Sequence, residues 1–183
     1  PADAQVLAAT QSPPLIDRLE SMMIWSDNVM AEAVGHELAV HRGQPGSASA
    51  ATQSTLDVLT GHGFDITGVT LADNSGLSTY NLIPPRVLDD VLHDAASDTP
   101  LRHLLATLPV AGGSGTLTDR YQDLPGRGWV RAKTGTLTGT SALAGVVTAD
   151  SGRVYSFALL SNGSDILAAR AALDRFASAI RDS

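Results

Sequence analysis

Gly-Trp-Val-Arg-Ala-Lys-Thr-Gly-Thr-Leu-Thr, residues 128–138, reads as a β-strand, and the residues after it indicate the kind of sheet it joins. Two further strands are predicted at Ala142–Ala149 and Val154–Ser161. The connections between the three are only a few residues long, which is typical of antiparallel hairpins. The second and third strands are apolar on both faces and should lie between covering layers. The first strand, which carries Lys133, suits an edge of the sheet.

Helices are expected before and after this sheet. Gln5–Thr10 is a short apolar run that we interpret as the end of a strand. A helix should then begin with Ser12 as N-cap and Pro13 at the first helical position, and end near Trp25. A second helix should begin around Asn28. The remaining helices are predicted at Ser47–Leu59, Pro84–Ala96, Leu101–Thr107 and Asp165–Ile180, the last with an apolar face formed by Ile166, Ala169, Leu173, Phe176 and Ile180.

The composition indicates a single compact domain. The chain has 183 residues, 43% apolar and 17% charged, which is typical of a globular protein with a sizeable core. A net charge of −7 argues against nucleic acid or an anionic membrane as the main partner. No apolar run is long enough to span a bilayer, and we expect neither a membrane span nor a signal peptide in these residues. Cysteine is absent, which excludes disulfides and thiolate metal sites.

Two short polar motifs stand out because of where they lie. Ser26–Asn28 (Ser-Asp-Asn) falls at the junction of the first two helices, and Lys133–Gly135 (Lys-Thr-Gly) falls on the edge strand. Each alone has an ordinary explanation, as a helix cap or as a solvated lysine that discourages strand aggregation. Together they match two of the three motifs of penicillin-interacting serine acyltransferases. The third, Ser-x-x-Lys, cannot be present because Lys133 is the only lysine, so the nucleophile must lie elsewhere.

Other kinds of site are not supported by the residue spacing. His36 and His41 are five apart, which on a helix places them about 140° apart, whereas a zinc-protease helix needs its two histidines on one face. No Gly-x-Ser-x-Gly elbow occurs, and Gly112–Gly115 is not followed by the lysine of a phosphate-binding loop. The aspartates show no metal-loop pattern. We therefore expect no cofactor and no metal.

Nearly the whole chain resembles the penicillin-binding D-alanyl-D-alanine carboxypeptidase/endopeptidase family, the low-molecular-mass serine D,D-peptidases with inserted domains. The matching segments, in the family's order, are Gln11–Leu15, Ser26–Glu32, Asp73–Ser78, Leu108–Arg120 and Ala132–Leu137. The resemblance implies an α+β, penicillin-binding/β-lactamase-like transpeptidase fold, with an antiparallel sheet flanked by helices and a helical cluster, incomplete in this chain. It also implies that residues 1–183 are the C-terminal portion of one catalytic domain. Its helical part is expected at about 12–107, its strands at about 128–161 and its last helix at about 165–180. A class A β-lactamase is disfavoured because the only glutamates, Glu20, Glu32 and Glu37, all lie on early helices.

The resemblance also implies roles for six residues. It makes Ser26 and Lys133 catalytic and gives substrate binding to Asn28, Thr134, Gly135 and Thr136. Lys133 would supply positive charge for the terminal carboxylate of the substrate, helped by the two threonine hydroxyls. Ser26 would relay a proton toward the leaving amine, Asn28 would hydrogen-bond a peptide amide, and the N–H of Thr136 would serve as one oxyanion donor. Asp27 would brace the loop.

The expected activity is that of a serine-type D-Ala-D-Ala carboxypeptidase/endopeptidase of the periplasmic or extracytoplasmic cell envelope. It would act on peptidoglycan stem peptides and be acylated by β-lactams. The partner expected for this chain is the N-terminal portion of the same enzyme, as a separate or missing chain, which would supply Ser-x-x-Lys. The alternative is a non-catalytic fragment or interaction module that keeps the fold. The residues leave open whether carboxypeptidase or endopeptidase work is preferred.

Overall fold

The sheet has three antiparallel strands in the order β1-β2-β3. In the computed structural model, which describes residues 4–97, 100–163 and 165–183, they span Val130–Leu137 (β1), Thr140–Thr148 (β2) and Val154–Asn162 (β3). The three predicted strands are thus confirmed, each with ends shifted by at most two residues. β1 lies at an edge, as its polar residues indicated. Among the described residues β3 also has a neighbour on one side only.

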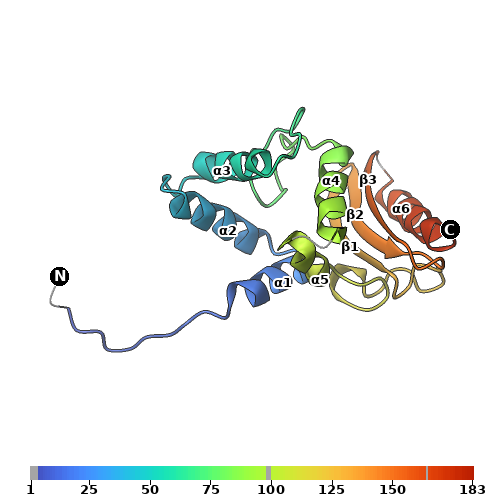
Figure 1. Cartoon of the computed structure of the whole chain (residues 1–183), viewed down its shortest axis with the longest axis horizontal. Helices are drawn as coiled ribbons and strands as arrows, with labels where there is room; N and C mark the ends of the chain where they lie inside the picture. Colours follow the sequence, from blue (N-terminus) through green and yellow to red (C-terminus); the bar gives the residue numbers. More distant parts are fainter. Residues whose placement is uncertain (1–3, 98–99, 164) are drawn as a thin grey trace.

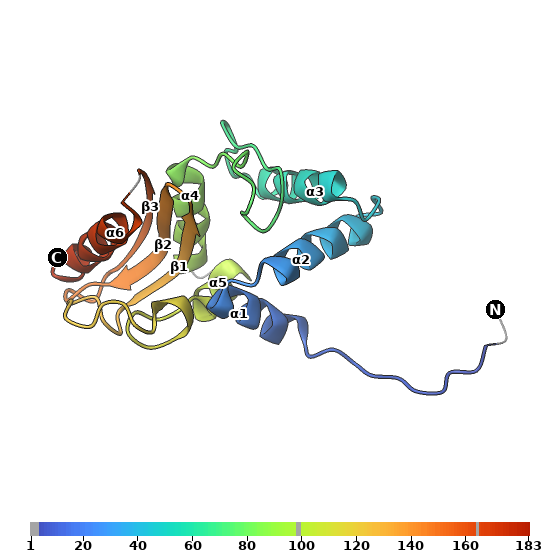
Figure 2. The ribbon, with the colours of Figure 1, turned by 180° about the vertical axis from the view of Figure 1, so that it is seen from behind.

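Helices cover both faces of the sheet, which explains why β2 is apolar on both sides. Figures 1 and 2 show α6 (Ile166–Arg181) on one face and α4 (Pro85–Ala96) on the other. Every odd position of β2 from Ser141 to Val147 is buried in this sandwich. Gly145 lets β1 approach closely, because a Cβ there would lie 2.6 Å from the Cα of Ala132 on the neighbouring strand.

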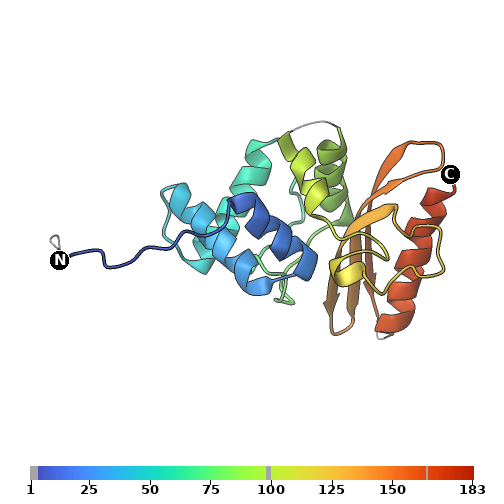
Figure 3. The same ribbon diagram turned by 90° about the horizontal axis from the view of Figure 1, so that it is seen from below.

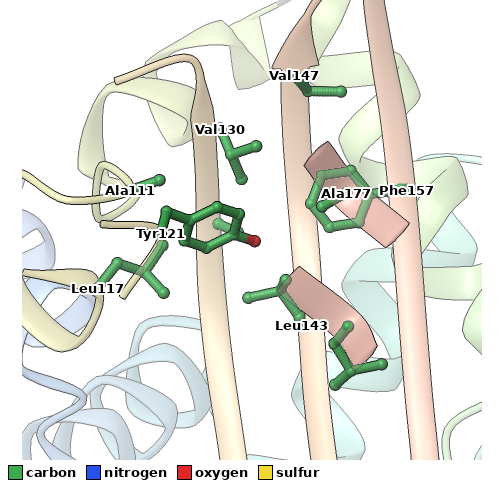
Figure 4. Close-up of a cluster of buried hydrophobic side chains, with 10 residues drawn as sticks. Ala111, Leu117, Tyr121, Val130, Leu143, Val147, Phe157 and Ala177 are labelled. Carbon is green, nitrogen blue, oxygen red and sulfur yellow. The ribbon is translucent and has the colours of Figure 1, made fainter. Parts of the chain in front are cut away.

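The core lies between the sheet, α6 and the segment that precedes β1 (Figure 4). Its buried members are Ala111, Leu117, Tyr121, Val130, Ala132, Leu143, Val147, Phe157, Leu173 and Ala177. Three of them come from the segment at 111–121, which otherwise has little regular structure apart from the 3-10 turn η2 (Gly115–Leu117). The core therefore fixes that segment against the strand that carries the Lys-Thr-Gly motif.

A group of helices lies beside the sheet (Figure 3). It comprises α1 (Leu15–Trp25), α2 (Asn28–His41), α3 (Ala48–Gly61) and α5 (His103–Thr107), the last preceded by the 3-10 turn η1 (Pro100–Arg102). α2 packs against α3, whereas α1 has no fully buried residue. No described helix is both long enough and apolar enough to cross a membrane.

Two predictions at the N-terminal end are wrong. Residues 4–14 form no strand and lie exposed along an extended path. The first helix begins at Leu15, with Pro14 at the N-cap and no side-chain cap, and not at Ser12. The reason lies in the Pro13-Pro14 pair: a residue before proline is pushed out of the helical region, so Pro13 cannot be helical.

The apolar face predicted for the last helix is also partly wrong. Leu173 is buried as expected, but Phe176 is 54% exposed. The buried stripe runs through Leu173, Asp174, Ala177 and Ser178. Residues 176 and 177 differ by about 100° around the helix axis, so a stripe centred on Ala177 turns Phe176 away from the sheet.

Candidate active site

Ser26 and Lys133 lie 107 residues apart in the sequence and meet in the structure. The Nζ of Lys133 donates a hydrogen bond of 2.6 Å to the Oγ of Ser26 and another of 2.7 Å to the carbonyl oxygen of Thr134. Neither contact is to a carboxylate, and no ion pair forms to this lysine within the described part of the chain. The structure thus brings together the two residues that the motifs singled out.

The backbone around Ser26 aims its hydroxyl toward β1. Ser26 ends α1 in the left-handed conformation, with φ 57° and ψ 50°, and its N–H donates to the carbonyl of Met22. Asp27 then caps the next helix, because its Oδ1 accepts from the N–H of Met30 at 3.0 Å. Asp27 thus braces the start of α2. A one-residue change of direction between two capped helices presents the serine at the junction.

Lys133 is held in a partly buried place on β1. Its strand neighbour is Ala144 on β2, and the interior of β1 is fixed by the buried Val130 and Ala132. Burial lowers the pKa of the Lys133 ammonium below its ordinary value. Loss of solvent disfavours the charged form, so this lysine releases a proton more readily than an exposed one.

A cavity of about 260 Å³ opens beside this pair. It is lined by Ser26, Thr116, Arg120, Thr134, Thr136 and Arg170. Of the six predicted site residues, Ser26, Thr134 and Thr136 line the cavity, and Lys133 joins it through Ser26. Asn28 and Gly135 do not: Asn28 is the first residue of α2, and Gly135 lies partly buried in β1 opposite Ala142.

Hydrogen bonds between side chains tie the cavity walls together. The Oγ1 of Thr134 donates to the Oγ1 of Thr116 at 3.0 Å, which joins β1 to the turn η2. Arg120 binds both carboxylate oxygens of Asp174 on α6, at 3.0 and 2.6 Å. Burial, followed by the charge of Asp174, raises the pKa of Tyr121 far above its ordinary value, so that phenol stays neutral. Arg170, also on α6, donates to the Oγ1 of Thr136 at 3.0 Å.

Sequence reasoning did not assign a role to Thr116, Arg120 or Arg170. Thr116 and Arg120 fall in a segment that carries the family resemblance, but nothing in their spacing indicated a cavity. Arg170 and Asp174 are four apart on α6 and therefore share a helix face, a signal that could have drawn attention to them. The sequence does not indicate which face of α6 meets β1.

The loop at Asp73–Ser78 is held against α2. The Oε1 of Glu32 accepts the N–H groups of Asn74 and Ser75 at 3.0 and 2.9 Å. Burial would raise the pKa of Asp73, but hydrogen bonds from Asn81, Gly76 and Ser78 lower it below its ordinary value. Two of the segments that carry the resemblance thus contact each other and steady the helix that follows Ser26. Across the described residues, no group of three or more acidic, histidine or cysteine side chains is placed to hold a metal ion.

Comparison with known proteins agrees on one family. The profile of the D-Ala-D-Ala carboxypeptidase 3 (S13) family matches residues 1–180. Carboxypeptidase DacB of Mycolicibacterium smegmatis is 49% identical over 181 residues, which is 96% of this chain and 39% of that protein. The D-alanyl-D-alanine carboxypeptidase of Actinomadura sp. is 36% identical over 88% of this chain and 31% of its own length. The chain thus spans between about a third and two fifths of these relatives.

Solved structures show the same fold. Penicillin binding protein 4 of Haemophilus influenzae superposes with a TM-score of 0.82 at 32% identity, over 89% of this chain and 38% of that one. The predatory endopeptidase Bd3459 of Bdellovibrio bacteriovorus, acylated by penicillin G, superposes with a TM-score of 0.72 at 20% identity, which supports the fold alone. The expected α+β penicillin-binding fold is therefore confirmed.

Proposed function

The chain belongs to the D-Ala-D-Ala carboxypeptidase 3 (S13) family, and on that premise we propose that it supplies part of the active site of a serine-type D-alanyl-D-alanine carboxypeptidase/endopeptidase. In this proposal residues 1–183 are the C-terminal portion of one catalytic domain. The nucleophilic Ser-x-x-Lys motif lies in a complementing portion of the same enzyme. We use "complete enzyme" below for this chain together with that portion.

The observation that carries the proposal is the 2.6 Å hydrogen bond from Lys133 to Ser26. Because the Ser26 hydroxyl accepts from the ammonium, its own proton is free to point toward a third group. A lysine whose pKa is lowered by burial can give up or regain a proton at modest cost. The pair is thus suited to pass a proton between a nucleophile and the amine that leaves during acyl transfer.

The cavity next to the pair has the features that a peptide with a free C-terminus would need. Thr134 and Thr136 line it, and Lys133 supplies positive charge behind Ser26. Gly135 has no side chain, so a substrate backbone can lie along β1 at this point. We assign the N–H of Thr136 as an oxyanion donor and Asn28 to a peptide amide on the acyl side.

The natural substrate in this proposal is a peptidoglycan stem peptide that ends in D-Ala-D-Ala, and β-lactams acylate the same site. The place of action is the extracytoplasmic cell envelope. Two observations support the need for a complementing portion. The chain spans 39% of the length of the DacB relative. Helix α1 exposes apolar side chains, with Leu15 and Ile16 about half exposed.

A fluorescent penicillin tests the proposal directly. We expect the 183-residue chain alone to stay unlabelled, because its only lysine belongs to the Lys-Thr-Gly strand. The complete enzyme should be labelled on the serine of Ser-x-x-Lys and should release D-alanine from a stem peptide. Labelling of the chain alone that disappears when one of its own serines is replaced would contradict the location of the nucleophile.

A folded complex that is neither labelled nor active would overturn the proposal. It would then favour the alternative, a non-catalytic module that keeps the penicillin-binding fold. The intact masses of both polypeptides show whether a penicilloyl group is present and which polypeptide carries it, so the two outcomes are distinguished in one sample.

A further inference from the structure

The cavity beside Ser26 is lined by basic and hydroxyl side chains, although the net charge of the protein is −7. Two of its lining residues are arginines, and none of the described residues that line it is acidic. Lys133 adds a third cationic group at its edge through Ser26. A site with this balance favours an anionic ligand.

The two arginines differ in how their charge is satisfied. Arg120 is neutralised by Asp174, which takes two of its N–H groups in a bidentate pair. Arg170 forms no ion pair with any residue that the structure describes, and its one hydrogen bond goes to the neutral hydroxyl of Thr136. Most of its donor groups thus remain available at the cavity.

The ammonium of Lys133 is less available than its motif suggests. It already donates to the Oγ of Ser26 and to the carbonyl of Thr134, and an ammonium has three N–H groups in all. One donor is left for a ligand. Arg170, by contrast, presents a planar fork that matches the two oxygens of a carboxylate.

We propose that Arg170 is the residue that binds the C-terminal carboxylate of the peptide directly, alongside the hydroxyl of Thr136, while Lys133 acts mainly on Ser26. The identity of the ligand rests on the proposed function. The Thr136 hydroxyl accepts a hydrogen bond from the Arg170 guanidinium at the cavity wall. A carboxylate that enters between them accepts hydrogen bonds from the free N–H groups of Arg170 and from the hydroxyl of Thr136.

Equilibrium binding by calorimetry tests this assignment, using the complete enzyme with its nucleophilic serine replaced by alanine so that no turnover occurs. The ligands are N-acetyl-D-alanyl-D-alanine and its C-terminal carboxamide, which differ only in charge at the terminus. Arg170→Gln should weaken binding of the free acid about ten- to hundredfold, the loss of a charge-assisted bond. The same variant should leave binding of the carboxamide within about twofold.

The matched control is Arg175→Gln, an exposed arginine on the same helix, which should change neither affinity. Arg170→Lys should recover part of the loss, because the charge returns without the fork. Thr136→Val, which removes the hydroxyl that holds the guanidinium, should weaken the free acid in the same direction. Circular dichroism of each variant checks that the fold is kept.

Three results would overturn the inference: wild-type affinity of Arg170→Gln for the free acid, an equal loss for both peptides, or a wild-type protein that does not prefer the acid. Failure of the proposed function is seen separately. If the complete wild-type enzyme is not labelled by penicillin but still distinguishes the two peptides through Arg170, the carboxylate site is supported and the proposed activity is refuted. If labelling occurs and Arg170→Gln has no effect on peptide binding, the proposed activity is supported and the role of Arg170 is refuted.

Discussion

Replacing Asp174 by leucine should show how much the buried ion pair contributes to the fold around the cavity. Arg120 and Asp174 share two hydrogen bonds, and their side chains are only 17% and 10% exposed. In Asp174→Leu the guanidinium keeps its charge in a nearly dry place without a carboxylate. Removing one partner of a buried pair costs about 3–5 kcal/mol in the free energy of unfolding. The expected result is therefore a large loss of stability from a change that keeps the number of side-chain heavy atoms the same.

A double-mutant cycle isolates the pair from the rest of the site. Arg120→Met should also destabilise, whereas Arg120→Met combined with Asp174→Leu should recover most of the loss, because an apolar pair leaves no uncompensated charge. The measurement is urea denaturation of the complete enzyme for the wild type and the three variants, with exposed Arg175→Met as control. Losses that add to within about 0.5 kcal/mol would refute the reasoning, since they would mean that the two side chains are not coupled.

Three further predictions concern the strand that carries the Lys-Thr-Gly motif and its contacts with Ser26 and β2. Lys133→Ala should lower the efficiency with which penicillin acylates the complete enzyme by about ten- to hundredfold, and Lys133→Arg should recover only part of that loss. Ser26→Ala should lower the acylation rate more than it weakens initial binding. Acylation of Lys133→Ala at the wild-type rate would contradict the role given to the lysine. Because burial lowers the pKa of Lys133, the unfolded chain holds the lysine proton over a pH range in which the folded chain has released it. Stability should therefore rise with pH from the lowered folded pKa up to the ordinary value, and denaturation of Lys133→Met at neutral and alkaline pH should show that rise removed. Gly145→Ala should push a Cβ against the backbone of Ala132 and cost roughly 1–3 kcal/mol, whereas Gly61→Ala, which meets no atom within 4 Å, should be neutral or stabilising in the same melts.

The elements that the sequence predicted best are those with strong local signals. The three strands follow from their runs of apolar residues and from short connections, and the helix from Pro85 follows from a proline that is preorganised for a first turn. The position of Ser26 at a junction follows from the two predicted helices on either side of it, which cannot form one continuous helix. Each of these depends on residues that are close neighbours in the chain, so a single sequence contains the necessary information.

The parts that could not be predicted depend on distant contacts. The exposed position of Phe176 and the approach of Arg170 to the cavity both follow from how α6 rotates on the sheet. That rotation is decided by the packing of Leu173 and Ala177 against strands that are far away in the sequence. The Ser-Pro-Pro start was misread for another reason, since a cap signal at Ser12 competes with a proline pair that forbids the helix.

Ser26 sits in a backbone conformation that suits glycine better than serine. The left-handed region costs a residue with a side chain about 1–2 kcal/mol, and the hydroxyl that reaches Lys133 depends on that geometry. A glycine at position 26 would relieve the cost and remove the hydroxyl. Directed evolution of this protein for heat resistance alone would thus favour loss of the Ser26 hydroxyl, which accepts the hydrogen bond from Lys133. Selection schemes need an activity screen at every round to keep both.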